Sequence, residues 1–129
     1  MTRFFMMTAA ATAALSLAAC ESYAAGHAHK AVKTSAEGYL TDGHDMTLYT
    51  FDKDAAGVSN CNGGCAKAWP PLMAEADAKA EGKYSVVTRD DGSKQWAYNG
   101  MPLYTWTKDA KAGDTTGDGF KDMWKVAKP

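Results

Sequence analysis

The chain carries one short motif twice: Leu48-Tyr49-Thr50-Phe51-Asp52-Lys53-Asp54 recurs 55 residues later as Leu103-Tyr104-Thr105-Trp106-Thr107-Lys108-Asp109. The same offset aligns Trp69 with Trp124, and no gap is needed between the motif and the tryptophan. Because two copies are too few for a solenoid, we expect two equivalent units that share one core. The length of 129 residues also suits a single domain.

The residues around the motifs favour strands joined by tight turns. Residues 39–51 predict a hairpin, and residues 84–106 predict a three-stranded meander. Asp-Gly and Asn-Gly pairs separate the apolar runs, and these pairs accept the positive φ that hairpin turns require. Aromatic residues are frequent within the predicted strands, where they can pack across a pleated face.

Two further segments complete the expected fold. The Ala- and Lys-rich stretch from Met73 to Glu81 predicts a short helical segment between the repeats, and Lys121 to Val126 predicts a last strand that carries Trp124 inward. The expected fold class is therefore all-β, or β-rich α+β. It is a small single domain of two pseudo-repeated β units.

Each copy of the motif places a tyrosine, a second aromatic residue and an aspartate at fixed spacing: Tyr49, Phe51 and Asp54, then Tyr104, Trp106 and Asp109. This pattern resembles the Tyr-x-aromatic-x-x-Asp motif of a family of secreted repeat lipoproteins of unknown function. The cysteine pair ahead of Trp69-Pro70-Pro71 also resembles that family. The resemblance implies export and a lipid anchor, and it implies no particular activity.

The first 19 residues have the features of a signal peptide. Arg3 supplies a positive start, and the apolar run from Phe4 to Ala19 is shorter than the roughly 20 residues of a membrane-spanning helix. Leu17-Ala18-Ala19-Cys20 resembles a lipobox, so we expect Cys20 to carry the lipid that binds the protein to a membrane. Ordinary cleavage after Ala24, which would release a soluble form, is the alternative.

The mature chain is expected to begin with a flexible tether, residues 20–37, because this stretch is small, polar and without an apolar period. The repeat domain then spans 38–129, with halves at about 38–75 and 84–129. Glu21 follows the lipidated cysteine, and in a Gram-negative host this favours the outer membrane, facing the periplasm or the exterior. A soluble periplasmic or secreted location is the alternative.

Cys61 and Cys65 are predicted to form a disulfide. Cys20 is lipidated or removed, which leaves an even pair in an oxidising compartment. A redox-active pair is an alternative, although such pairs more often have two intervening residues than three.

The motif residues have two interpretations. In the first, each tyrosine and aspartate forms a polar binding site at the end of a strand, one site per half. In the second, the tyrosines pack inward and the aspartates stabilise turns by accepting backbone N–H bonds.

The function expected is that of a non-catalytic envelope lipoprotein, a binding, interaction or structural module. The net charge of −1 argues against nucleic acid as a partner. None of the usual catalytic motifs is found, so we predict no enzyme activity and no cofactor. The alternative is a periplasmic copper-binding or redox accessory protein, with His27 and His29 as the candidate ligands.

Overall fold

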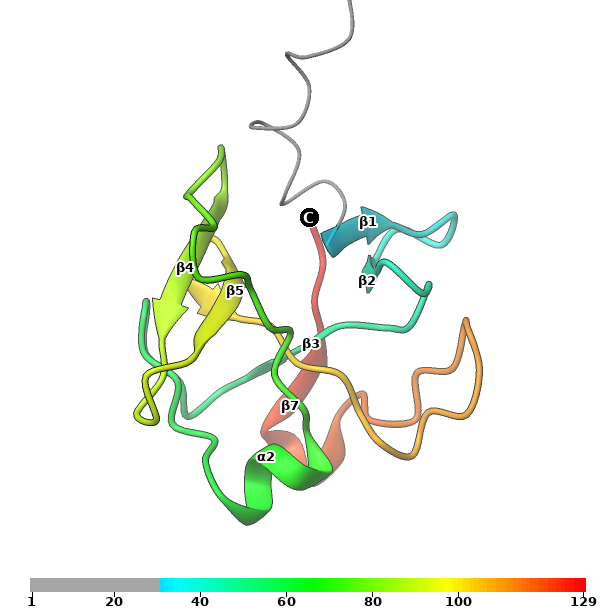
Figure 1. Ribbon diagram of the computed structural model, residues 1–129. Helices are drawn as coiled ribbons and strands as arrows, with labels where there is room; N and C mark the ends of the chain where they lie inside the picture. Colours follow the sequence, from blue (N-terminus) through cyan, green and yellow to red (C-terminus); the bar gives the residue numbers. More distant parts are fainter. Residues whose placement is uncertain (1–30) are drawn as a thin grey trace, which may run out of the picture.

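The computed structural model describes residues 31–129 (Figure 1). The signal peptide, the lipidation of Cys20 and metal binding by His27 and His29 concern residues outside this range and stay predictions. Among residues 31–129, no helix has the length and apolar character needed to cross a membrane.

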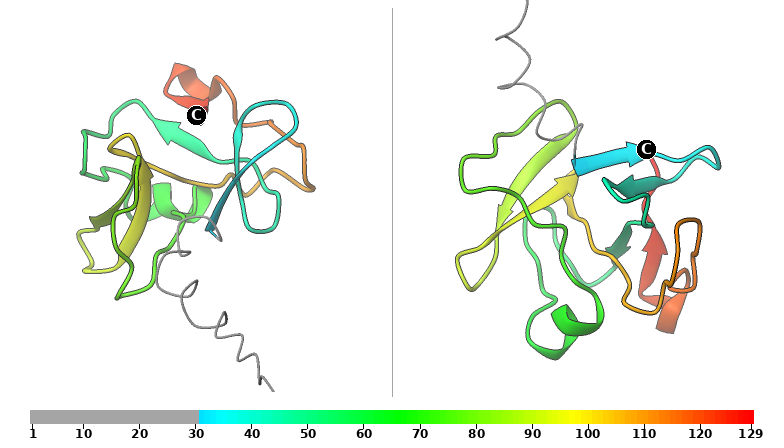
Figure 2. Two further views of the ribbon diagram at one scale, coloured as in Figure 1. Left: turned by 90° about the horizontal axis from the view of Figure 1, so that it is seen from above. Right: turned by 45° about the vertical axis from the view of Figure 1, so that its right-hand side comes forward.

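Residues 31–129 are strand-rich with one short α-helix, which confirms the predicted fold class. The strands form three small antiparallel sheets, β1–β2, β3–β7 and β4–β5–β6. The bounds in chain order are β1 Val32–Thr34, β2 Leu40–Asp42, β3 Tyr49–Phe51, α2 Gly64–Ala68, β4 Tyr84–Thr88, β5 Lys94–Tyr98, β6 Met101–Pro102 and β7 Trp124–Val126. Thus β4 to β6 form the predicted meander, and β7 is the predicted last strand. In Figure 1, β3 and β7 lie between the β1–β2 pair and the β4–β5 hairpin, and Figure 2 gives two further views.

The two repeats exchange their last segments. Strand β7 ends the second repeat and pairs with β3 of the first, which places Phe51 opposite Trp124. In the equivalent place, the end of the first repeat pairs with the second motif, where the Thr105 N–H donates to the Pro70 carbonyl at 2.9 Å. At the centre, Tyr49 and Tyr104 each donate an N–H to the carbonyl of the other, at 2.7 and 3.0 Å. Each repeat therefore completes the β-structure of the other.

Two closed rings of backbone hydrogen bonds fix this exchange. Each ring contains three residues, and the backbone N–H of each residue donates to the carbonyl of the next. The N···O distances are 2.8–3.0 Å. The residues of the two rings are Leu40, Ala127 and Leu48, and Trp96, Leu72 and Leu103. One member of each ring, Ala127 or Leu72, comes from the opposite repeat. These two residues are themselves related by the 55-residue offset.

The core divides into two clusters, and the paired Tyr49 and Tyr104 belong to the second. The first is mainly aliphatic and includes most of the ring residues. The second is aromatic, and its buried members are Tyr49, Phe51, Cys61, Trp69, Tyr104, Trp106 and Trp124. Its members come from both repeats, so the aromatic cluster exists only when the repeats are combined.

The predicted helix from Met73 to Glu81 is wrong. Met73 instead bridges to Gln95, and the Ala74 N–H donates to the Lys94 carbonyl at 2.9 Å, so the segment begins as an extra strand beside β5. A helix of two turns is weak on its own. The first half of β5, beyond its pairing with β6 at Ala97 and Tyr98, offers free backbone groups and stronger pairing. The helix that does form, α2, follows the cysteine pair.

The predicted tether does not extend to residue 37. Val32 to Thr34, inside the predicted 20–37 tether, form β1 and pair with β2. Val32 is 4% exposed and packs in the aliphatic cluster. A strand of three residues with one buried apolar side chain leaves no periodic pattern in the sequence.

A substitution at Gly117 tests how closely the aromatic cluster is packed. A Cβ there would lie 2.6 Å from Cη2 of Trp69 and 3.1 Å from Cδ1 of Trp106. Since both indoles are stacked against other rings, we expect Gly117→Ala to lower the free energy of unfolding by about 1–3 kcal/mol in urea titrations. Gly64→Ala is the matched control, because a Cβ at Gly64 in α2 has nothing within 4 Å. This variant should be neutral or more stable by up to about 1 kcal/mol. Equal stability of the two variants would contradict the packing.

Candidate functional site

The tyrosine of each motif bonds to the aspartate of the other motif. The Tyr49 hydroxyl donates to Asp109 Oδ2 at 2.7 Å, and the Tyr104 hydroxyl donates to Asp54 Oδ2 at 2.6 Å. All four side chains are buried. The structure therefore brings the predicted motif residues together, but in exchanged pairs that spacing within one motif does not reveal.

The second carboxylate oxygen of each aspartate holds a turn of its own repeat. Asp54 Oδ1 accepts the Asn60 N–H at 2.6 Å, and Asp109 Oδ1 accepts the N–H and hydroxyl of Thr116 at 3.0 and 2.6 Å. These contacts match the second of the two interpretations, inward tyrosines with turn-stabilising aspartates. A polar binding site within each half, as in the first interpretation, is not formed, because the four side chains are buried and bond between the halves.

Burial changes the acidity of this network. It raises the pKa of the Tyr49 and Tyr104 phenols, and the hydrogen bonds to the carboxylates raise the pKa further. Burial also raises the pKa of Asp54, an effect opposed by the hydrogen bonds from Tyr104 and Asn60 and by the Arg89 charge.

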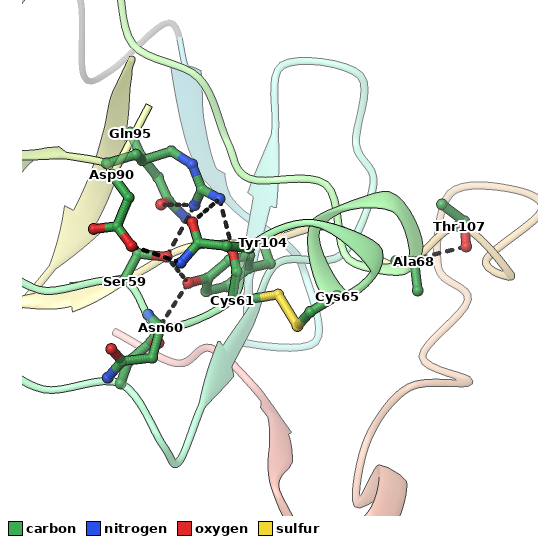
Figure 3. Close-up of a disulfide and its surroundings, with 12 residues drawn as sticks. Ser59, Asn60, Cys61, Cys65, Ala68, Asp90, Gln95, Tyr104 and Thr107 are labelled. Atoms are coloured by element: carbon green, nitrogen blue, oxygen red, sulfur yellow. Dashed lines mark hydrogen bonds between the residues drawn. A yellow bond between two sulfur atoms is a disulfide. The ribbon is translucent and has the colours of Figure 1, made fainter. Parts of the chain in front are cut away.

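A buried arginine extends the network on one side only. Arg89 is 6% exposed and donates to Ser59 Oγ at 2.9 Å, to Gln95 Oε1 at 2.7 Å and to the Cys61 carbonyl at 2.6 Å. Ser59 Oγ lies 2.6 Å from the Tyr104 hydroxyl, and Figure 3 shows both residues near the disulfide. Arg89 therefore links the cysteine loop to the motif. Sequence reasoning missed Arg89, since an arginine next to an Asp-Asp-Gly turn has the pattern of a surface residue.

The predicted Cys61–Cys65 disulfide is confirmed (Figure 3). It joins the segment before α2 to the first turn of that helix, and Cys61 is fully buried in the aromatic cluster. Arg89 holds the Cys61 carbonyl, so the loop is fixed both covalently and by a charged donor.

Four aromatic rings form one continuous stack across the two repeats. Phe51 stacks on Trp124 with 4.3 Å between ring centroids, Trp124 on Trp69 with 3.8 Å, and Trp69 on Trp106 with 3.8 Å. The rings alternate between the first and second repeats. Trp69 and Trp124 occupy equivalent positions and are almost parallel, at 3°. The stack is therefore symmetric about its centre.

An apolar groove of about 300 Å³ lies along this stack. Four pairs of residues related by the 55-residue offset line it, together with one lysine: Phe51 and Trp106, Cys65 and Phe120, Ala68 and Met123, Trp69 and Trp124, and Lys121. Pockets that bind small ligands have a similar volume and a mainly apolar lining. The groove can bind an apolar or aromatic group, and Lys121 is the charged member of its lining.

The turn that carries Lys121 is strained. It spans Phe120–Asp122, where the second repeat aligns with helix α2 of the first. Lys121 and Asp122 have φ angles of 51° and 55°, in the left-handed region that favours glycine. Strained turns of this kind are concentrated at functional sites. The sequence carries no signal for the groove beyond the equivalence of Trp69 and Trp124.

The exchanged bonds predict a late ionisation of Tyr49 and Tyr104. Because their pKa is higher in the folded than in the unfolded protein, their contribution to stability is complete below about pH 10, the unfolded value. This contribution is lost as the pH rises through the folded value. In an absorbance titration at 295 nm, we expect two phenols to ionise only together with alkaline unfolding.

The double variant Tyr49→Phe, Tyr104→Phe is the control for this titration and should lack the late step. Ionisation of all the tyrosines near pH 10 in a protein that remains folded by near-UV circular dichroism would contradict the buried bonds.

Comparison with known proteins identifies both repeats. A family model described as a secreted repeat of unknown function matches residues 31–73 and 85–128. No curated protein and no solved structure gives a significant match. The family description suggests an extracellular or cell-envelope location. Since the family model matches most of the chain, once in each repeat, the chain belongs to this family of secreted repeats of unknown function.

Proposed function

We propose that this protein is a cell-envelope lipoprotein that presents a non-catalytic binding module, with the aromatic groove as its binding face. The lipid on Cys20 anchors the chain, and the residues between Cys20 and β1 separate the folded domain from the membrane. The groove is the observation that carries the proposal, because it is an apolar surface that both repeats build together.

The hydrogen bonding of the buried polar side chains leaves the groove as the candidate binding surface. In residues 31–129, every buried side-chain nitrogen and oxygen has a hydrogen-bond partner. The motif tyrosines and aspartates are engaged with each other, so these buried groups serve the scaffold. The groove, in contrast, is an apolar hollow of about 300 Å³ lined by largely buried rings of the aromatic cluster and by the exposed Lys121.

The sequence before the domain supports the anchor. Leu17-Ala18-Ala19-Cys20 has the order of a lipobox, and the family is described as secreted. Modification with more than one acyl chain gives stable membrane attachment, whereas one chain gives only reversible binding. Glu21 favours the outer membrane in a Gram-negative host.

The intact mass of the mature protein from its native host tests the anchor. We expect a product that begins at Cys20 with the added mass of acyl chains, recovered in the membrane fraction. A Cys20→Ala variant should lack this added mass. An unmodified product beginning at Ala25 would contradict the anchor and favour the soluble alternative, in which His27 and His29 lie close to a free amino terminus.

A further inference from the structure

We propose that the aromatic groove binds a small planar aromatic anion, of the aryl carboxylate class, and that Lys121 pairs with its charged group. This inference rests on the proposed function, since it takes the groove as the binding face and assigns a ligand chemistry to it. Three features of the groove carry the proposal: the ring edges, the lysine in its lining and the volume.

The stack presents ring edges to the groove. Trp69 lies between Trp106 and Trp124, and Trp124 lies between Trp69 and Phe51, so both faces of each central ring are covered. With both faces covered and only 3% and 2% of their surface exposed, Trp69 and Trp124 can offer a ligand only the rims of their edges. Aromatic edges carry partial positive charge and aromatic faces partial negative charge. The floor of the groove therefore favours the π face of an incoming ring.

Lys121 makes an otherwise symmetric groove electropositive at one side. The lining residues come in equivalent pairs, but the residue equivalent to Lys121 is Ala66, which carries no charge. Lys121 Nζ lies 5.5 Å from the centroid of the Phe120 ring, beside the groove. The salt bridges between described residues are Lys33–Asp45 and Lys125–Asp52, and neither engages Lys121. Its charge is available to an anion.

Lys121 has a strained backbone conformation. Lys121 adopts φ 51° and ψ 24°, a conformation in which glycine or asparagine would be less strained. The same turn places the Phe120 ring 5.0 Å from Trp106 and 5.7 Å from Trp69, where it forms a wall of the groove. One strained turn thus supplies both a ring and a cation to the same site.

The volume limits the size of the ligand. About 300 Å³ is at the lower end of the range of small-molecule sites, which suits a ring system of one or two rings rather than an extended chain. A second cation, Lys108 Nζ, lies 5.9 Å from the centroid of Trp106, the end ring of the stack that Phe120 also contacts, and adds to the positive potential.

The test compares three probes: 2-naphthoate, the uncharged 2-naphthalenemethanol, and cyclohexanecarboxylate, which is charged but not planar. Affinities for the mature protein are measured by calorimetry, and ¹H–¹⁵N spectra locate binding through the indole N–H signals of Trp69, Trp106 and Trp124. We expect naphthoate to bind about two- to fivefold more tightly than the alcohol, as one exposed ion pair allows. Cyclohexanecarboxylate should bind more weakly than naphthoate. The preference for the anion should decrease with added salt.

Three variants isolate the role of Lys121. Lys121→Asn removes the charge and keeps a residue that tolerates the left-handed backbone, so it should fold and should lose the preference for naphthoate. Lys121→Arg should retain the preference. Lys53→Asn, which removes an exposed lysine that does not line the groove, should leave the preference unchanged.

The outcomes separate this inference from the proposed function. Equal affinity for naphthoate and its alcohol, with shifts at the groove indoles, would overturn the anion site and leave the groove as a binding face. A preference that survives in Lys121→Asn would also overturn the role of Lys121. If neither naphthalene shifts the groove indoles, the groove is not a binding face, whatever the mass of the mature protein shows about the anchor.

Discussion

Two buried carboxylates in this protein each depend on a phenol that the opposite repeat supplies. The Tyr104 hydroxyl donates a hydrogen bond to Asp54, and the Tyr49 hydroxyl donates one to Asp109. A buried carboxylate that loses a hydrogen bond destabilises the fold by more than the intact bond contributes, because the group stays desolvated. Neither repeat can therefore bury its own aspartate satisfactorily alone. The pairing of the two tyrosine backbones at the centre brings both exchanged bonds into place at once.

The aromatic groove follows from the same exchange. When each repeat adds its last segment to the other, the two equivalent tryptophans come face to face. Trp69 arrives with the disulfide helix α2, and Trp124 arrives with the strained turn that carries Lys121. These two segments align at the 55-residue offset but have different structures. The duplicated scaffold is thus nearly symmetric, while its surface at the groove is not. One side is held by a disulfide and Arg89, and the other side presents a cation.

Much of the scaffold could be predicted from local patterns. The gap-free repeat predicted two equivalent units, the Asp-Gly and Asn-Gly turns predicted the meander, and the isolated cysteine pair predicted the disulfide. The errors lie where a distant partner decides the outcome. Met73 and Ala74 join β5 rather than a helix, because pairing with the part of β5 that β6 does not cover outweighs weak helix propensity. A repeat alone does not say whether Tyr49 bonds to Asp54 or to Asp109. The groove needs both repeats, and no single segment encodes it.

Native-state hydrogen exchange tests the interlocking of the repeats most directly, since it measures local stability in the intact protein. Six amides, those of the two rings of backbone hydrogen bonds, report on how the repeats interlock. They belong to Leu40, Leu48 and Ala127 in one ring, and to Leu72, Trp96 and Leu103 in the other. We predict that both sets exchange with one opening free energy, equal to that of global unfolding, because neither ring can open while the other stays closed. A markedly lower opening free energy for one set, with the other still protected, would show that the repeats are independent units and would contradict this account.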